Sequence, residues 1–297
     1  MEDAVKALTF VPPALADHTK PSLAWSRSLD GIKNVGVVIL AAGRGKRMHA
    51  TVDNPKVLMP VLGAPLIMHL LSSIKASRVR TRPVIVIAPD LYVIRDRVGS
   101  ACEYAIQESQ LGTGHAVLAA KEKLARYDHI LVLCGDHPLV SFRTIDMLVG
   151  AHLQSGAEVT LATVTVPHFE GWYSIFAHYG RVLRNAQGNI MGIIEQKDAS
   201  PGEAEILEVN PSYFIFKAPW LWAVLPKLKR ENAQGEYYLT DVVGRAIQDG
   251  RTVNALALAS PDEALGINTA EQLEMVEKIM RCRLDESARA HTIPLPL

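Results

Sequence analysis

Short apolar runs rich in Val and Ile alternate with longer amphipathic stretches from Val35 onward, and this alternation restricts the fold more than any other feature. Nearly continuous apolar runs are typical of strands buried on both faces of a sheet. Their alternation with helices predicts an α/β fold, a Rossmann-like, mostly parallel mixed sheet with helices on both faces. Ligands of such sheets bind outside the carboxyl ends of the strands. Strands are expected at 35–40, 84–88, 130–133, 159–166 and 213–216, and helices at 65–75, 114–126, 142–155, 239–248 and 270–281.

The chain has 297 residues, 48% of them apolar, which is enough for a large core. Residues 1–31 show no sustained period and contain Pro12, Pro13 and Pro21, so we expect a tail or arm there. The alternating pattern predicts one domain over 32–283, and 284–297 are expected to form a C-terminal tail.

Charge and hydropathy exclude several classes of partner. The 31 Lys and Arg residues balance the 31 Asp and Glu residues, so overall charge indicates neither nucleic acid nor an anionic membrane as a partner. The sequence contains no apolar run long enough for a membrane span and no secretory signal pattern. Cys102, Cys134 and Cys282 are far apart and suit reduced thiols, so we expect a cytoplasmic protein.

The first expected strand runs directly into a glycine-rich, basic turn, A-A-G-R-G-K-R-M, which ends at Met48. Gly43 and Gly45 can adopt backbone angles closed to other residues and expose their N–H groups, which suits an anion. The dinucleotide-binding fingerprint needs a third glycine where Met48 stands, and a P-loop needs four residues between its glycines rather than one. The turn therefore indicates a different phosphate site, and a tight surface turn with solvated charges is the alternative.

A carboxylate follows the expected strand at 130–133. Asp136 would lie at the carboxyl end of that strand, where parallel sheets keep their chemistry. Magnesium prefers hard oxygen ligands and takes only one or two from protein beside the phosphates of a substrate. Asp136 fits that role, although it could instead cap a turn or the next helix.

Two further groups of residues have both a functional and a structural interpretation. Gly112 and Gly114 flank Thr113 before an Ala-rich helix, which suits close approach of a flat ligand or a phosphate, or else a helix entry capped by Thr113. Glu195 could accept hydrogen bonds from a ligand, or could be a surface charge paired with Lys197.

Together these stretches form a series of motifs that spans most of the chain, from about residue 35 to about residue 278. The motifs are L-A-A-G-x-G-x-R-M, P-K-V-L, Q-x-x-Q-L-G-T-G-H-A, G-D-x-P-L, Y-G-R, I-x-E-Q-K-D-A, E-x-N, N-A-Q-G-E-Y-Y-L-T-D and G-x-N. The series resembles the sugar-1-phosphate nucleotidyltransferase family. It is most similar to the uridylyltransferase domain of bacterial bifunctional N-acetylglucosamine-1-phosphate uridylyltransferase/glucosamine-1-phosphate acetyltransferases. The resemblance implies a fold of the nucleotide-diphospho-sugar transferase type over 32–283.

The resemblance also implies a role for each matching residue. The phosphates of the nucleoside triphosphate would be held by the catalytic residues Arg47 and Lys56. Nucleotide-binding residues would be Leu40, Ala41, Ala42, Gly43, Gly45, Gln107, Gly112 and Thr113. Sugar-binding residues would be Gly180, Glu195 and Asn210, and a Mg²⁺ cofactor would be held by Asp136 and Asn268.

Four positions depart from the family pattern. Lys46 stands where the family usually has a small hydroxyl residue, and Cys134 where the uridylyltransferases often have tyrosine. Pro211-Ser212 replaces Thr-Gly after Asn210, and proline removes an N–H and fixes the backbone. Because most of these changes fall among the residues expected around the sugar, the reaction class is better defined than the sugar.

The resemblance implies a nucleotidyltransferase that forms a UDP-sugar and pyrophosphate from UTP and a sugar-1-phosphate, most simply N-acetylglucosamine-1-phosphate, by Mg²⁺-assisted in-line attack on the α-phosphate. The alternatives are another sugar or nucleotide, a non-catalytic regulatory module that binds a nucleotide sugar, and a nicotinamide-linked dehydrogenase, which the missing third glycine disfavours. Hexapeptide repeats are absent from the sequence, so we expect no acetyltransferase activity. The oligomeric state is not indicated.

Overall fold

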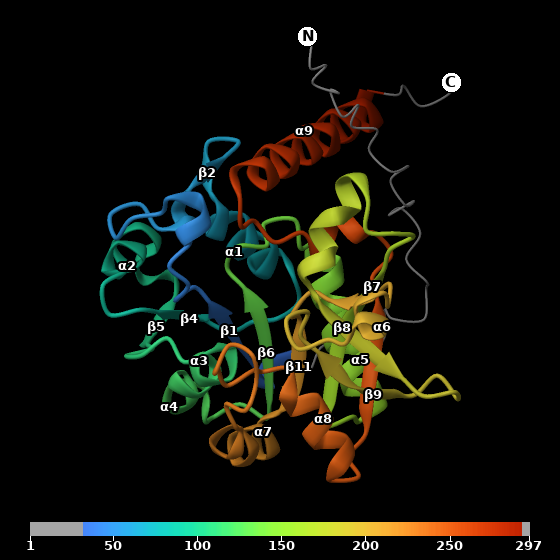
Figure 1. Cartoon of the computed structure of the whole chain (residues 1–297). Coiled ribbons are helices and arrows are strands. Elements are labelled where there is room, and N and C mark those ends of the chain that lie inside the picture. Colours follow the sequence, from blue (N-terminus) through green and yellow to red (C-terminus); the bar gives the residue numbers. More distant parts are fainter. Residues whose placement is uncertain (1–31, 293–297) are drawn as a thin grey trace, which may run out of the picture.

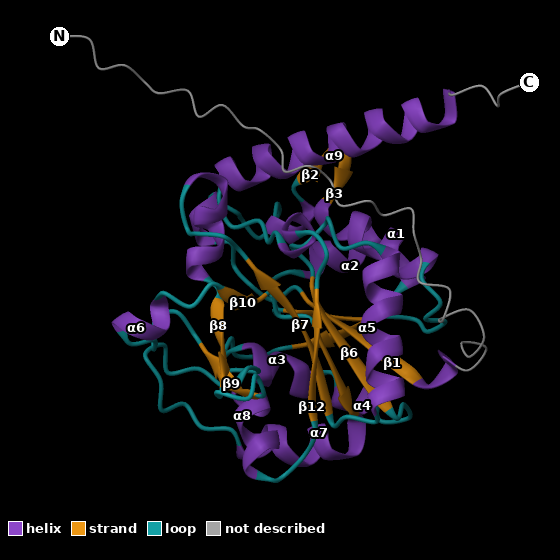
Figure 2. Cartoon of the chain, turned by 90° about the vertical axis from the view of Figure 1, so that its right-hand side faces the viewer, coloured by secondary structure: helices purple, strands orange, loops and turns teal. Residues whose placement is uncertain are grey.

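The computed structural model describes residues 32–292, in which a ten-stranded sheet carries helices on both faces (Figure 1, Figure 2). Its order is β5-β4-β1-β6-β11-β7-β10-β8-β9, and β12 pairs with β7. The strands are β1 (Val35–Leu40), β4 (Val84–Ile87), β5 (Glu103–Ile106), β6 (His129–Cys134), β7 (Val159–Thr165), β8 (Gly180–Arg184), β9 (Ile190–Ile194), β10 (Glu208–Asn210), β11 (Phe214–Lys217) and β12 (Val253–Ala257). A separate hairpin pairs β2 (Pro60–Val61) with β3 (Ala64–Pro65).

The helices lie on either side of this sheet, and the last one crosses above its upper edge in Figure 1. They are α1 (Leu66–Ala76), α2 (Tyr92–Val98), α3 (Thr113–Ala119), α4 (Lys121–Leu124), α5 (Phe142–Ser155), α6 (Pro201–Ala204), α7 (Ala218–Val224), α8 (Asp241–Gln248) and α9 (Ala270–Thr292). Within residues 32–292 no helix combines the length and the apolar character that a membrane crossing needs.

Strand direction divides the sheet into two halves. β5, β4, β1 and β6 are all parallel, whereas β11 runs antiparallel to both β6 and β7. β10 and β8 continue the antiparallel half, and β12 is parallel to β7. The carboxyl ends of β1, β4, β5 and β6 therefore meet at one edge. The expected Rossmann-like mixed sheet with helices on both faces is confirmed.

Local capping explains why α5 matches its expected range of 142–155. The Ser141 hydroxyl accepts the N–H of Thr144 at 3.1 Å, and Gly156 ends the helix in the left-handed region with φ of 60°. The single helix expected at 114–126 is instead two short helices, α3 and α4, separated by Ala120.

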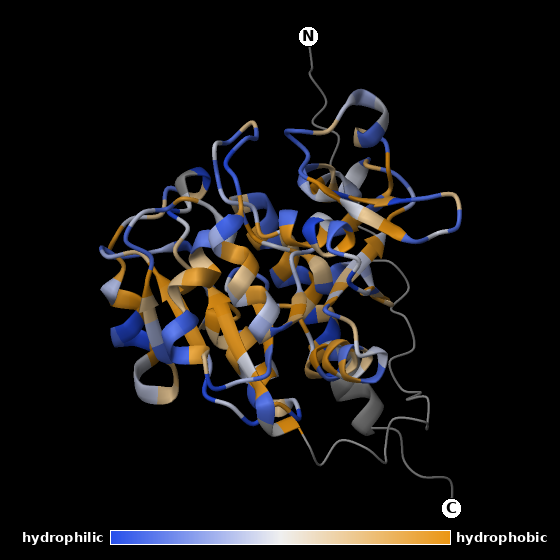
Figure 3. Ribbon diagram, turned by 90° about the horizontal axis from the view of Figure 1, so that it is seen from below, coloured by the Kyte–Doolittle hydropathy of each residue, from blue (hydrophilic) through white to orange (hydrophobic). Residues whose placement is uncertain are grey.

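Apolar residues concentrate in the strands, and polar residues dominate the surrounding loops (Figure 3). A second, smaller apolar cluster lies under α9 and includes Met48, Phe176 and Val276. The arm expected at 1–31 lies outside the described residues. α9 extends beyond residue 283, where we expected a C-terminal tail to begin.

A buried histidine of α5 is linked to two strands. Nε2 of His152 lies 3.0 Å from Nδ1 of His129, and Nδ1 of His152 lies 3.0 Å from the Thr160 hydroxyl. Burial above all, with the charges of His129 and Lys217, lowers the pKa of His152 to about 3. His152 therefore stays neutral in the folded chain at physiological pH.

Acidification from pH 7 to pH 5 is expected to cost about 2 kcal/mol of unfolding free energy through His152. The unfolded histidine, with a pKa near 6.5, binds a proton over this range and the buried ring does not, so stability present above pH 6.5 is lost as the pH falls. Urea unfolding at both pH values should show a smaller loss in His152→Asn than in the wild type. His49→Asn, at an exposed position, should keep the full loss; equal losses in all three proteins would contradict this assignment.

Candidate active site

A cavity of about 550 Å³ opens at the carboxyl ends of β1, β5 and β6. This is the edge of the sheet at which ligands of parallel α/β folds bind. Its walls include all the nucleotide-binding residues expected from the sequence, Leu40, Ala41, Ala42, Gly43, Gly45, Gln107, Gly112 and Thr113, together with Lys56, Cys134 and Asp136.

Gly45 holds the glycine turn against Lys56. Its φ is +58°, and a Cβ there would lie 2.8 Å from the Lys56 Cβ and 2.9 Å from the Ala50 Cβ, so a side chain is excluded by backbone angle and by space. Met48, which replaces the third glycine of a dinucleotide fingerprint, is buried in the cluster under α9. The end of the turn is thus fixed by apolar packing.

Three polar side chains from distant parts of the sequence meet at this cavity, and two of them, Lys56 and Asp136, line it. The Lys56 Nζ donates to Asp136 Oδ2 at 2.5 Å and to Asn268 Oδ1 at 2.9 Å. The backbone N–H of Ile267 donates to the carbonyl of Asp136 at 3.0 Å, which ties the Asn268 segment to the end of β6. Both oxygens therefore face one cationic group.

Asp136 is ionised in this setting. Burial raises its pKa, but the Lys56 charge and hydrogen bond, helped by His137, outweigh burial, and the net pKa lies below the ordinary value for aspartate. A carboxylate and an amide oxygen that already share one cation match the donor set that Mg²⁺ takes from proteins. The two residues expected to hold the metal, Asp136 and Asn268, thus fit it.

A softer metal fits the neighbouring residues poorly, although ligand atoms of Cys134, Asp136 and His137 all lie within 4.8 Å of one another. Nδ1 of His137 is 2.7 Å from the Tyr213 hydroxyl, which gives its own proton to a backbone carbonyl, so Nδ1 is the donor. Nε2 lies against Gly266, where a Cβ would be 2.3 Å away. Burial raises the pKa of the Cys134 thiol well above its usual range. His137 is therefore a packing residue beside Asp136.

Gln107 follows β5 and is buried at one wall of the cavity. Its Nε2 lies 3.1 Å from the Gly112 carbonyl and 3.1 Å from Nδ1 of His115. Within the described residues no hydrogen bond engages its Oε1. The side chain is thus held from one end, and its carbonyl oxygen is available to a ligand N–H.

The glycines around Thr113 are required by a neighbouring segment. Gly112 has a φ of +110°, and a Cβ there would lie 2.7 Å from the Tyr237 carbonyl oxygen. The Gly114 N–H donates to that same carbonyl at 2.8 Å, and the Thr113 hydroxyl accepts the N–H of Leu239 at 3.0 Å. The Q-L-G-T-G-H-A and E-Y-Y-L-T-D motifs therefore form one wall, and the Thr113 hydroxyl is committed to holding it together.

Two smaller cavities continue from the first, one adjoining it and the other adjoining the second. One of about 150 Å³ shares Leu40, Thr113 and Glu236 with it. The other, of about 380 Å³, shares Glu195 with the 150 Å³ cavity and is lined also by Arg47. Arg47, which we expected at the phosphates, thus lines the cavity beside Glu195 and not the 550 Å³ cavity.

Glu195 ends up between polar neighbours at the end of β9. Its Oε1 accepts from the Thr240 hydroxyl at 2.8 Å, and a Cβ on Gly180 would lie 3.5 Å from its Oε2. Burial raises the pKa of Glu195 despite the Thr240 bond, and the nearby Asp241 raises it further. Lys197, considered above as its ion-pair partner, instead donates to Gln234 at 2.7 Å.

Asn210 and Ser212 have different positions relative to these cavities. The amide of Asn210 is buried, donates to the Ala162 carbonyl at 3.1 Å and accepts the Ser212 N–H at 3.0 Å. Ser212 has a φ of 63°, a region that favours glycine, and lines the 150 Å³ cavity together with Glu195. The sugar contact of Asn210 stays a prediction, and Ser212 is the residue of this segment that borders a cavity.

Some residues at the cavities had no assigned role in the sequence analysis. Arg44 pairs with Asp90 at 2.7 Å and donates to Gln110 at 3.2 Å, and Gln110 in turn donates to the Ala42 carbonyl. These hydrogen bonds join the glycine turn to the Q-x-x-Q motif. His178, Gln234 and Glu236 line the cavities as well. Gln110, Gln234 and Glu236 belong to the motifs of the sequence analysis. Their position in a motif was the only feature of the sequence that could have indicated a place at the site.

Known proteins are similar to this chain in sequence, and others are similar to it in fold. A family model described as the MobA-like NTP transferase domain matches residues 37–231. The chain is 39% identical over 248 residues to the bifunctional protein GlmU of Geobacillus thermodenitrificans, covering 83% of this chain and 52% of that protein. It is 36% identical over 251 residues to the bifunctional protein GlmU of Desulfotalea psychrophila, covering 84% and 71%. The chain thus spans about half the length of the former.

Two solved structures share the fold at low sequence identity. One is described as a glucose-1-phosphate thymidylyltransferase from Bacillus anthracis in complex with sucrose (TM-score 0.66, 17% identity, 89% of this chain and 98% of that chain). The other is CMP:2-keto-3-deoxy-manno-octonic acid synthetase with CTP (TM-score 0.62, 16% identity, 84% and 100%). The fold and these matches define a nucleotidyltransferase. The chain belongs to the family of MobA-like NTP transferase domains, and the expected similarity to the uridylyltransferase domain of the bifunctional proteins is confirmed.

Proposed function

We propose that the chain forms a UDP-sugar and pyrophosphate from UTP and a sugar-1-phosphate, with N-acetylglucosamine-1-phosphate as the expected acceptor. The observation that carries the proposal is the set of adjoining cavities. It brings the glycine turn and Gln107 next to Lys56 and Asp136 and continues to Glu195. A nucleotide in the 550 Å³ cavity of this set would thus lie beside a second space lined by groups that bind hydroxyls.

The reaction needs little acid–base chemistry. An oxygen of the sugar phosphate, already ionised near neutral pH, would form a bond to the α-phosphorus of UTP as the bond to pyrophosphate breaks in line. Catalysis then rests on positioning and on neutralising charge, for which Arg47 and Lys56 supply cations. Mg²⁺ held by Asp136 and Asn268 would add Lewis-acid neutralisation of the phosphates.

Gln107 supports uracil as the base. Its Nε2 is occupied by Gly112 and His115, which leaves Oε1 as an acceptor toward the cavity. Uracil offers an N–H to such an acceptor at the position where cytosine has a lone pair. This arrangement therefore favours UTP over CTP.

The sugar-1-phosphate acceptor is the part of the proposal for which the site supports an alternative substrate. Ser212 and Cys134 line the cavities at positions where the family has glycine and often tyrosine. Each changes the size and the hydrogen-bonding groups of the wall. A different hexose phosphate is therefore the alternative acceptor.

Pyrophosphate release across a matrix of nucleoside triphosphates and sugar-1-phosphates, with and without Mg²⁺, tests the proposal. We expect release with UTP and N-acetylglucosamine-1-phosphate, its loss on adding EDTA, and its recovery with excess Mg²⁺. Release with another pair would keep the reaction and replace the substrate. No release from any pair, with UDP-sugar binding still measurable by calorimetry, would replace the enzyme by a regulatory module.

A further inference from the structure

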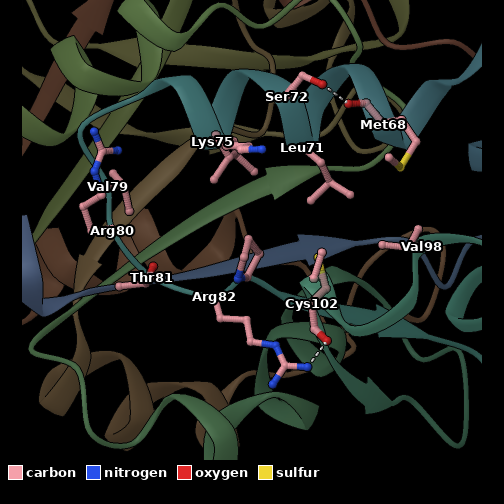
Figure 4. Close-up of a pocket in the computed structure, with 13 residues that line it drawn as sticks. Met68, Leu71, Ser72, Lys75, Val79, Arg80, Thr81, Arg82, Val98 and Cys102 are labelled. Carbon is pink, nitrogen blue, oxygen red and sulfur yellow. Dashed lines mark hydrogen bonds between the residues drawn. The ribbon is translucent and has the colours of Figure 1, made fainter.

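A second cavity of about 550 Å³ lies away from the active site (Figure 4). It opens between α1 and the residues that lead into β4 and β5, so it lies toward the amino ends of the strands whose carboxyl ends form the active site. None of its lining residues lines the three cavities of the active site. Its occupant would therefore be a separate molecule.

The walls of this cavity are mainly apolar. Met68, Leu71 and Lys75 repeat at the spacing that places them on one face of α1, and Val79 and Val98 face them from the neighbouring segments. Met68 is 37% exposed although it is a large apolar side chain. The cavity thus leaves apolar surface open that a ligand with an apolar body would cover.

The charged residues of the lining are all cationic, namely Lys75, Arg80 and Arg82. The Arg82 guanidinium donates to the Cys102 carbonyl at 2.9 Å, a bond drawn in Figure 4, and keeps its charge uncompensated by a carboxylate in the described chain. No hydrogen bond or ion pair engages the Lys75 ammonium within residues 32–292. An anionic group would be attracted to this rim.

A polar atom inside the lining also lacks a partner. The Thr81 Oγ1 is buried and makes no hydrogen bond within the described chain. Buried hydroxyls are usually satisfied, because a missing bond costs about 1–3 kcal/mol. The hydroxyl is enclosed by protein atoms, so it marks an incompletely satisfied part of the cavity wall.

We propose that this cavity binds a small organic anion, with its apolar body against Met68 and Leu71 and its acidic head near Lys75. The head is a carboxylate or a phosphate, since either pairs with a lone ammonium at the rim. The apolar floor distinguishes this ligand from the nucleotide and sugar phosphates of the active site, whose cavity is lined by glycine backbone and polar groups.

Fluorescence titration of the full chain with 8-anilinonaphthalene-1-sulfonate, in the presence of saturating UTP and Mg²⁺, tests this site. The probe combines an apolar body with one anionic group, and UTP blocks its entry to the active site. We expect one saturable site, with the Kd raised about fivefold in Lys75→Gln, the loss expected for one exposed charge pair. Leu71→Asp should raise it further, while Lys123→Gln, at an exposed position on α4, should leave it unchanged.

Octanoate and phenyl phosphate distinguish the two head groups. Displacement of the probe by octanoate alone assigns a carboxylate ligand, and displacement by phenyl phosphate alone assigns a phosphate. Binding that is unchanged in both Lys75→Gln and Leu71→Asp, or probe fluorescence that appears only without UTP, would overturn the proposal. Wild-type thermal unfolding of Lys75→Gln would show that its weaker binding is not a folding defect.

Discussion

Asp136→Asn should lower kcat for pyrophosphate release by at least about 10³-fold, an effect of several kcal/mol on the barrier. The substitution keeps an oxygen for Lys56 and a similar shape, but it removes the only full negative charge that the proposed metal site takes from the chain. Steady-state pyrophosphate release at saturating UTP, sugar phosphate and Mg²⁺ measures the effect. Circular dichroism and thermal unfolding should show a folded variant.

Asp249→Asn is the matched control for this experiment. Asp249 pairs with Arg245 at 2.8 Å on the exposed side of α8, away from the cavities, so its loss should leave kcat within about twofold of the wild type. Near-normal turnover by Asp136→Asn would remove Asp136 from the metal site. An equal fall in both variants would indicate a general defect.

Three strands of the parallel half, β1, β4 and β6, were predictable because they are nearly continuous apolar runs, whereas β5, which begins with Glu103, was missed. β1 has the limits expected from the sequence, β4 ends one residue earlier than expected, and β6 is one residue longer at each end. The antiparallel strands β8, β9 and β10 were missed. They are short, contain Gly180, Gly192 and charged residues, and obtain their pairing from one another, so no local period identifies them.

The site shows a similar division. The turn after β1 and the carboxylate after β6 follow from strand positions alone, because parallel strands end at one edge. The contact of Lys56 with Asn268 and the docking of Gly112 on Tyr237 join segments far apart in sequence. No spacing rule predicts such pairs. Likewise, the side-chain amide of Asn210 donates to the carbonyl of Ala162, a residue of a different strand, and the sequence gives no sign of this hydrogen bond.

Arg181 illustrates a role that a motif alone does not reveal. In the Y-G-R motif it follows Gly180, yet its side chain is 2% exposed and does not reach the cavities. Its guanidinium donates to the carbonyls of Ala177 at 2.9 Å and Ala204 at 3.1 Å, and also to that of Tyr179. No carboxylate in the described chain pairs with it. This buried cation therefore holds together, by hydrogen bonds to their carbonyls, the backbone segments next to the Glu195 side of the site.

Arg181→Met should lower the unfolding free energy by about 3 kcal/mol, because several buried carbonyls lose their donor at once. Urea unfolding measures this loss, and KM for the sugar phosphate should rise with it as the backbone around Gly180 loosens. Arg184→Met on the same strand removes a two-point pair with Glu208 near the surface and should cost under about 1 kcal/mol. Comparable small losses in both variants would mean that water replaces the guanidinium, and that the carbonyls around Arg181 are less enclosed than its burial indicates.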